Sequence, residues 1–131
     1  MSREFQNQSD ARAFLKQILQ TVGADAAALH VPTEQGLTEA ASLPSPQTIP
    51  IEAVRKCLQT GETVRQGRPG EALPTRLTVP LPGARGTLSA GWAAPAGPDA
   101  GAERVLQACA EAARWALETW ELRRRLEDCL G

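Results

Sequence analysis

Tyrosine is absent from this sequence of 131 residues, histidine occurs once and cysteine three times. The lack of tyrosine, together with only two phenylalanines, argues against a large aromatic ligand cage, although three tryptophans could still build one. An odd number of cysteines does not suit a secreted disulfide framework. The cysteines and His30 form no CxxC or HxxxH pair, so we expect no metal site.

Strong charge of one sign and long apolar runs are also missing. Fourteen basic and fifteen acidic residues give a net charge of -1, which supplies no general attraction for nucleic-acid phosphates. The one basic cluster, Arg123 to Arg125, has acidic neighbours and predicts a solvated helix face. No segment has the length of a membrane span or the pattern of a secretory signal. We therefore expect a cytoplasmic protein that contacts neither nucleic acid nor membrane.

The residues that are present fit one folded domain. Hydrophobic residues make up 42% of the chain and charged residues 22%, which are ordinary proportions for a globular protein. The length is sufficient for one buried core without disulfides or metals. We expect a single domain over residues 1–131, with its core over about 9–122 and a last helix that reaches about 130.

Glycine and proline divide the first half of the chain into three segments of regular structure. Apolar residues at helical spacing predict a first helix over 9–22, with Ser9 and Asp10 as capping candidates. Two short apolar runs predict antiparallel strands over 26–31 and 37–43. A return to helical spacing predicts a middle helix over 51–58.

The second half predicts strands followed by one long helix. A short strand is expected over 63–66, and the glycine and proline content of 67–74 is typical of a mobile loop that could act as a lid. Alternating apolar residues predict a hairpin with strands over 76–81 and 87–94. A helix of about thirty residues is expected from Asp99 nearly to the C-terminus. This order of elements predicts the α+β class.

The hairpin and the middle helix carry the most telling local sequences. These are Leu77-Thr78-Val79-Pro80-Leu81, Gly86-Thr87-Leu88-Ser89-Ala90-Gly91-Trp92 and, after the helix, Thr60-Gly61-Glu62-Thr63-Val64. The first two resemble the strand, tight turn and glycine-containing return strand of the GAF family of sensor domains. The third resembles the turn by which that family's middle helix leads into a short strand. The likeness covers about residues 9–122.

The resemblance implies a fold and a role. The fold would be a central antiparallel sheet, with the N- and C-terminal helices packed on one face and a small-molecule pocket on the other, under the middle helix and loops. The role would be that of a non-catalytic sensory or regulatory domain in bacterial signal transduction. The cofactor, if there is one, stays unknown from the sequence.

Polar residues on the predicted strands could line such a pocket. Arg65 or Arg68 could also reach an anionic group from the adjoining strand and loop. The residues alone favour a plainer interpretation, in which the arginines are solvated and the hydroxyls fill a strand face. His30 could conceivably bind haem, but no second ligand is signalled nearby, so a structural histidine is favoured. The candidate ligand-binding residues are His30, Arg76, Thr78, Thr87 and Ser89.

No catalytic constellation is evident in the sequence. The serines lack the GxSxG surroundings of a nucleophile elbow. Some GAF proteins reduce methionine sulfoxide with cysteines near the pocket, whereas Cys57 falls on the middle helix and Cys109 and Cys129 on the last one. We therefore expect no enzyme. The alternatives are a small redox enzyme of that type and a purely structural dimerisation module.

The predicted last helix carries two apolar stripes. The first has the width of a face packed on a sheet and comprises Leu106, Cys109, Ala113, Ala116, Leu117 and Trp120. The second keeps three-four spacing past the end of the expected core, so we expect it to meet a second copy in a homodimer. The resemblance also implies dimerisation through the terminal helices. The expected interface residues are Phe14, Ile18, Ala112, Trp115, Thr119, Leu122 and Leu126. The alternative is a monomer whose last helix frays.

Overall fold

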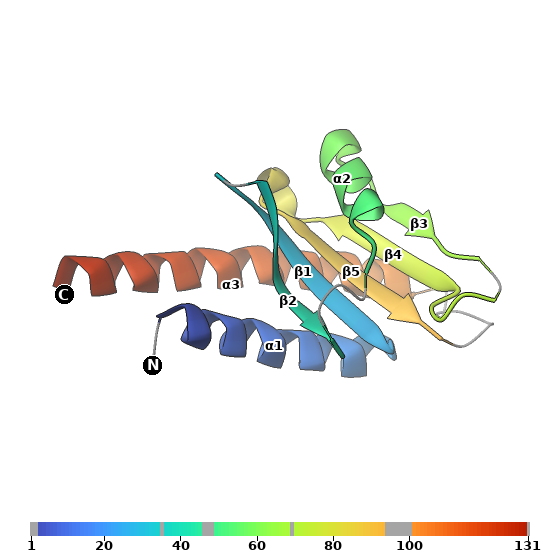
Figure 1. Ribbon diagram of the computed structural model, residues 1–131, viewed down its shortest axis with the longest axis horizontal. Helices are drawn as coiled ribbons and strands as arrows, with labels where there is room; N and C mark the ends of the chain where they lie inside the picture. Colours follow the sequence, from blue (N-terminus) through green and yellow to red (C-terminus); the bar gives the residue numbers. More distant parts are fainter. Residues whose placement is uncertain (1–2, 35, 46–48, 69, 94–100, 131) are drawn as a thin grey trace.

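The computed structural model describes residues 3–34, 36–45, 49–68, 70–93 and 101–130. Its elements follow the predicted order (Figure 1). They are α1 (Arg3–Val22), β1 (Ala26–Thr33), β2 (Gly36–Leu43), α2 (Ile51–Thr60), β3 (Val64–Gln66), β4 (Thr75–Pro80), the 3-10 turn η1 (Pro82–Ala84), β5 (Thr87–Trp92) and α3 (Ala102–Leu130). The predicted cap at Asp99 and the predicted end of the last strand at Ala94 lie outside the described residues.

The five strands form one antiparallel sheet in the order β2-β1-β5-β4-β3. The terminal helices α1 and α3 lie side by side on one face, and α2 lies on the other (Figure 1). This arrangement confirms the predicted α+β class and the placement of both terminal helices on the same face. The C-terminal half of α3 extends past the edge of the sheet, alongside the N-terminal part of α1 (Figure 1).

Predicted boundaries differ from the observed ones at several elements, and for two of them the physical reason is identifiable. The first helix begins at Arg3, so Ser9 and Asp10 both lie inside it and neither is at its N-terminus. The apolar face marks only the part of a helix that packs on a core, and no glycine or proline interrupts the residues before it. The first strand continues through Pro32 to Thr33. Proline is tolerated there because β1 pairs with β5 only as far as His30, so beyond that residue only β2 contacts it.

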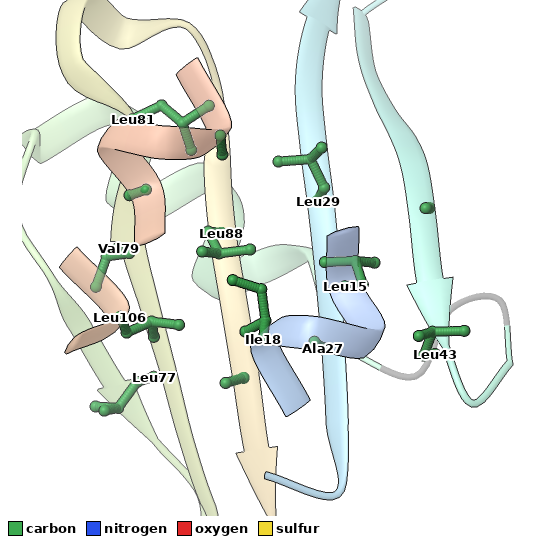
Figure 2. Close-up of a cluster of buried hydrophobic side chains, with 14 of the residues drawn as sticks. Leu15, Ile18, Ala27, Leu29, Leu43, Leu77, Val79, Leu81, Leu88 and Leu106 are labelled. Carbon is green, nitrogen blue, oxygen red and sulfur yellow. The ribbon is translucent and has the colours of Figure 1, made fainter. Parts of the chain in front are cut away.

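The main core fills the space between the sheet and the two terminal helices. Alternate residues of β1, β4 and β5 point toward the helices, and Leu15 and Ile18 of α1 and Leu106 of α3 pack onto them (Figure 2). Full burial of a leucine stabilises a fold by about 1.5–3 kcal/mol. The indole Nε1 of Trp92 donates a hydrogen bond of 3.2 Å to the carbonyl of Val22, which ties the end of β5 to the end of α1.

Candidate functional site

The five candidate ligand residues share the α2-facing side of the sheet. Because Leu77 and Leu88 point toward the terminal helices, their strand neighbours point the other way. The strand register then sets Thr78 opposite Ser89, and Thr87 opposite His30. Arg76 lies on the same side, one pair further along β4 and opposite Gly91. The structure therefore brings together residues from three strands that the sequence only marked individually.

The centre of this face is closed by α2. The Thr78 and Ser89 hydroxyl oxygens are 2.9 Å apart and hydrogen bonded to each other, and both side chains are fully buried. The Cys57 thiol of α2 donates to the Thr78 carbonyl at 3.7 Å. Ala53 and Cys57 are small enough for α2 to pack closely against Val64 of β3. A ligand could reach the Thr78 and Ser89 hydroxyls only if α2 moved.

Four buried polar atoms on this face have no hydrogen-bond partner among the described residues. They are His30 Nδ1, Ser42 Oγ, Arg76 Nε and Thr87 Oγ1. An unsatisfied buried polar group costs about 1–3 kcal/mol, so a small polar ligand that reached one of these atoms would gain a hydrogen-bonding partner. His30 itself is poorly placed for haem, because its ring is buried and its Nε2 lies 3.5 Å from a Glu39 carboxylate oxygen.

A cavity of about 340 Å³ opens at the end of this face, beside the described part of the loop that joins β3 to β4. Arg76 Nη1 donates to Glu71 Oε2 at 3.1 Å and to the Leu73 carbonyl at 3.2 Å. Three charged side chains therefore line the cavity, and one of them belongs to a candidate ligand residue. Its lining residues are Gln66, Gly67, Arg68, Glu71 and Arg76.

The second stripe of α3 lies on the surface of the chain. Trp115 is 65% exposed, Leu122 58% and Leu126 62%, and Ala112 and Thr119 are exposed as well. The Thr119 hydroxyl donates to the Trp115 carbonyl at 2.9 Å, so its hydrogen-bonding need is met within the helix. The stripe therefore offers an apolar surface without an unsatisfied hydroxyl in its middle.

Phe14 and Ile18 of α1 were expected beside this stripe in the dimer interface, and the prediction for Ile18 was wrong. Ile18 is only 3% exposed and belongs to the core between α1 and the sheet, so it is not available to a second chain. Phe14 is half-buried and packs against the same core. The spacing of the two residues placed them on one helical face, and the sheet covers most of that face.

The sequence matches no family model and no curated protein. The structure, however, is similar to that of the GAF domain of a protein described as a sensor histidine kinase from Pseudomonas syringae pv. tomato. The two are 25% identical, with a TM-score of 0.66 over 91% of this chain and 81% of that one. The GAF-B domain of DevS from Mycobacterium smegmatis is 21% identical, with a TM-score of 0.67 over 88% and 95%.

The chain has the GAF domain fold. The same fold occurs in the type II free methionine-R-sulfoxide reductase from Thermoplasma acidophilum, which is 11% identical with a TM-score of 0.71 over 91% of this chain and 97% of that one. The GAF fold therefore does not by itself distinguish a sensor from a redox enzyme. The reactivity of the cysteines is the property that distinguishes them.

Burial makes two of the three cysteines poorly suited to a reactive site. Burial raises the pKa of the Cys57 thiol to about 11, and burial also raises the pKa of Cys109. A thiol with a raised pKa is a poor nucleophile, because the thiolate is the reactive form. Cys129 is exposed near the end of α3. Among the described residues, no group of three or more His, Cys, Asp or Glu side chains could hold a metal ion.

The only histidine of the sequence is expected to give the stability of the chain a measurable pH dependence. Burial lowers the pKa of His30, although Glu39 partly opposes this shift. The unfolded chain therefore takes up a proton more readily than the folded one, and stability is expected to fall as the pH drops below about 6.5. Melting temperatures of the wild type and of His30→Gln across this range test the expectation. Equal pH dependence in both would contradict it.

Several residues that shape the core and the loop beside the cavity were missed from the sequence. Ala102 and Ala110 belong to the face of α3 that packs on the sheet, but alanine carries too little hydrophobic signal to be noticed. Leu73 lies against Gly91, where a Cβ would come within 2.8 Å of its side chain. A glycine inside a strand often marks such a close approach, and that signal could have pointed to the loop.

Among the described residues, no helix is both long and apolar enough to cross a membrane.

Proposed function

We propose that this chain is a non-catalytic regulatory GAF domain that works as a parallel homodimer through α3. The observation that carries the proposal is the exposed stripe of that helix. The comparison with GAF domains from sensor histidine kinases supports a regulatory role. The raised pKa of Cys57 argues against the redox alternative.

The stripe has the periodicity of a coiled coil. Val105, Ala112, Thr119 and Leu126 follow one another at intervals of seven, and a second series at the same interval runs through Ala108, Trp115, Leu122 and Cys129. All eight side chains are exposed in the single chain. Two such series, three and four residues apart, form the seam of paired helices. The seam faces away from the sheet, which Leu106, Ala110 and Ala113 contact from the other side of α3.

A second copy of the chain is the occupant that fits this seam. A two-fold interface requires a surface that is complementary to itself, and an uncharged apolar seam meets that condition. Glu118 and Arg123 flank it at positions that face each other between parallel helices. In a parallel dimer, Glu118 would lie next to Arg123 of the partner subunit. Exposed ion pairs add little stability, so this pair would set orientation more than affinity.

The apolar area available suggests a reversible dimer. Trp115, Leu122 and Leu126 from both copies would together contribute on the order of 10 kcal/mol on burial. The loss of translational and rotational freedom costs a comparable amount. We therefore expect the dimer to dissociate on dilution. In this proposal, a bound small molecule would act by shifting the helix packing of the dimer between two arrangements.

Light scattering and disulfide cross-linking together test the proposal. The expected mass is twice the chain mass of 14.0 kDa at high protein concentration. In a parallel dimer the two Cys129 residues face each other, so a mild oxidant should cross-link the chains, and Cys129→Ser should prevent this. In an antiparallel dimer the ends of α3 would be roughly 40 Å apart. A monomeric mass would refute the dimer, and a dimer without cross-linking would refute the parallel orientation.

A further inference from the structure

The described part of the loop between β3 and β4 is fastened at two points. Gly67 has a φ of +120° and lies so close to Pro74 that a Cβ would be 2.1 Å from the Pro74 carbonyl oxygen. Leu73 packs against Gly91 of β5. The backbone amide of Glu71 donates a hydrogen bond of 3.2 Å to the Arg68 carbonyl. This turn brings the side chains of Arg68 and Glu71 to the same cavity. The loop thus holds a set of charged side chains beside the sheet.

Arg76 is the fixed cation of this cavity. It stands on β4 with a side chain only 12% exposed, opposite Gln66 of β3 in the strand register. Nη1 contacts the Glu71 carboxylate and the Leu73 carbonyl, whereas the buried Nε has no partner among the described residues. A guanidinium carries five N–H donors, so the bonds to Nη1 leave part of its capacity unused.

In the ion pair between Arg76 and Glu71, the Glu71 carboxylate is the group that a ligand can displace. Its side chain is 41% exposed, and it holds Arg76 through a single contact of 3.1 Å. A carboxylate that is partly in water gives up such a contact at little net cost. Arg68 lines the same cavity, so without Glu71 the cavity would present two guanidinium groups and no acidic lining residue.

We propose that this cavity binds a small metabolite through a carboxylate or phosphate group, which replaces Glu71 on Arg76 and is also contacted by Arg68. A planar guanidinium suits either group, because it can form two parallel hydrogen bonds. The volume of about 340 Å³ is at the small end of ligand pockets, which favours a small molecule. The inference deepens the regulatory function proposed above and rests on it for its biological role. The binding itself does not depend on the dimer, because the loop and the overhanging part of α3 lie at opposite ends of the molecule (Figure 1).

Calorimetric titration of the full chain with inorganic phosphate and with succinate, at constant ionic strength, tests the site. Glu71→Gln removes the competing carboxylate and should bind at least one of the two probes about tenfold more tightly than the wild type. Arg76→Gln and Arg68→Gln should each weaken binding by about tenfold or more. Binding of only one probe would support the site and would identify the group that it prefers.

Arg65→Gln is the matched control. It removes the same charge one residue from Gln66, but Arg65 is opposite Leu77 in the register and therefore points to the other face of the sheet. The Arg65→Gln variant should bind phosphate and succinate with the same affinity as the wild type. Equal weakening by Arg65→Gln and Arg76→Gln would overturn the proposal, because net charge alone would then explain binding. Failure of Glu71→Gln to bind either probe would also overturn it.

Two further measurements, circular dichroism and light scattering, complete the test. If Arg76→Gln does not fold, as judged by circular dichroism, the exposed Arg68 carries the comparison instead. Light scattering on the same samples separates this proposal from the dimer. Anion binding by a monomer would support the anion site and refute the dimer. A dimer that binds neither anion would support the dimer and refute the anion site.

Discussion

Replacing Leu122 with glutamate is expected to convert the dimer into a monomer while the domain stays folded. Leu122 is 58% exposed in the single chain and contacts neither the sheet nor its core cluster, so the monomer loses little packing. In the dimer, by contrast, two glutamates would face each other at the centre of the seam. A buried, unpaired charge costs several kcal/mol, so the dissociation constant should rise by at least about a hundredfold.

Sedimentation or light scattering over a dilution series measures this effect. Gln107→Glu is the control, because it adds the same charge to an exposed position of α3 that lies off the seam. The control should dimerise like the wild type. If Leu122→Glu stays dimeric, another surface joins the two chains, and the seam has no part in it. Thermal unfolding of both variants verifies that the monomer is folded.

Replacing Gly86 with alanine is expected to be the most damaging single change in the hairpin. Gly86 has a φ of +147° and is so close to β1 that a Cβ would lie 2.2 Å from the His30 carbonyl oxygen. Because the obstacle is the backbone of a residue paired with strands on both sides, it cannot move aside as a flexible side chain can. Backbone strain and the clash together should lower the free energy of unfolding by about 3 kcal/mol or more.

Urea unfolding measures this loss, and Gly23→Ala separates its two causes. Gly23 also has a positive φ, of +65°, but nothing lies within 4 Å of a Cβ built on it. The control should therefore lose only the conformational term of about 1–2 kcal/mol. Equal losses in the two variants would show that the close approach to β1 does not constrain Gly86. Loss of the contact between β5 and β1 would also separate Thr87 from His30 on the candidate site.

Local patterns were enough to predict most of the fold. Alternating apolar residues predicted the hairpin of β4 and β5, and its apolar residues Leu77, Leu88 and Trp92 lie together in the core. The middle helix was predicted over 51–58 from helical spacing before Gly61, and α2 continues to Thr60 with Gly61 as its C-cap. Both signals depend only on residues close together in sequence, so a single chain reveals them without any tertiary contact.

The sequence by itself therefore determined the order of the elements, their class and the apolar stripe of α3. The tertiary structure alone decided that Thr78 and Ser89 satisfy each other under α2, that Ile18 is enclosed in the core, and that Glu71 meets Arg76 beside a cavity. The physical reason is that periodicity records which way a side chain points from its own element. What it meets there depends on strand register and loop closure, and these bring together residues that are distant in sequence.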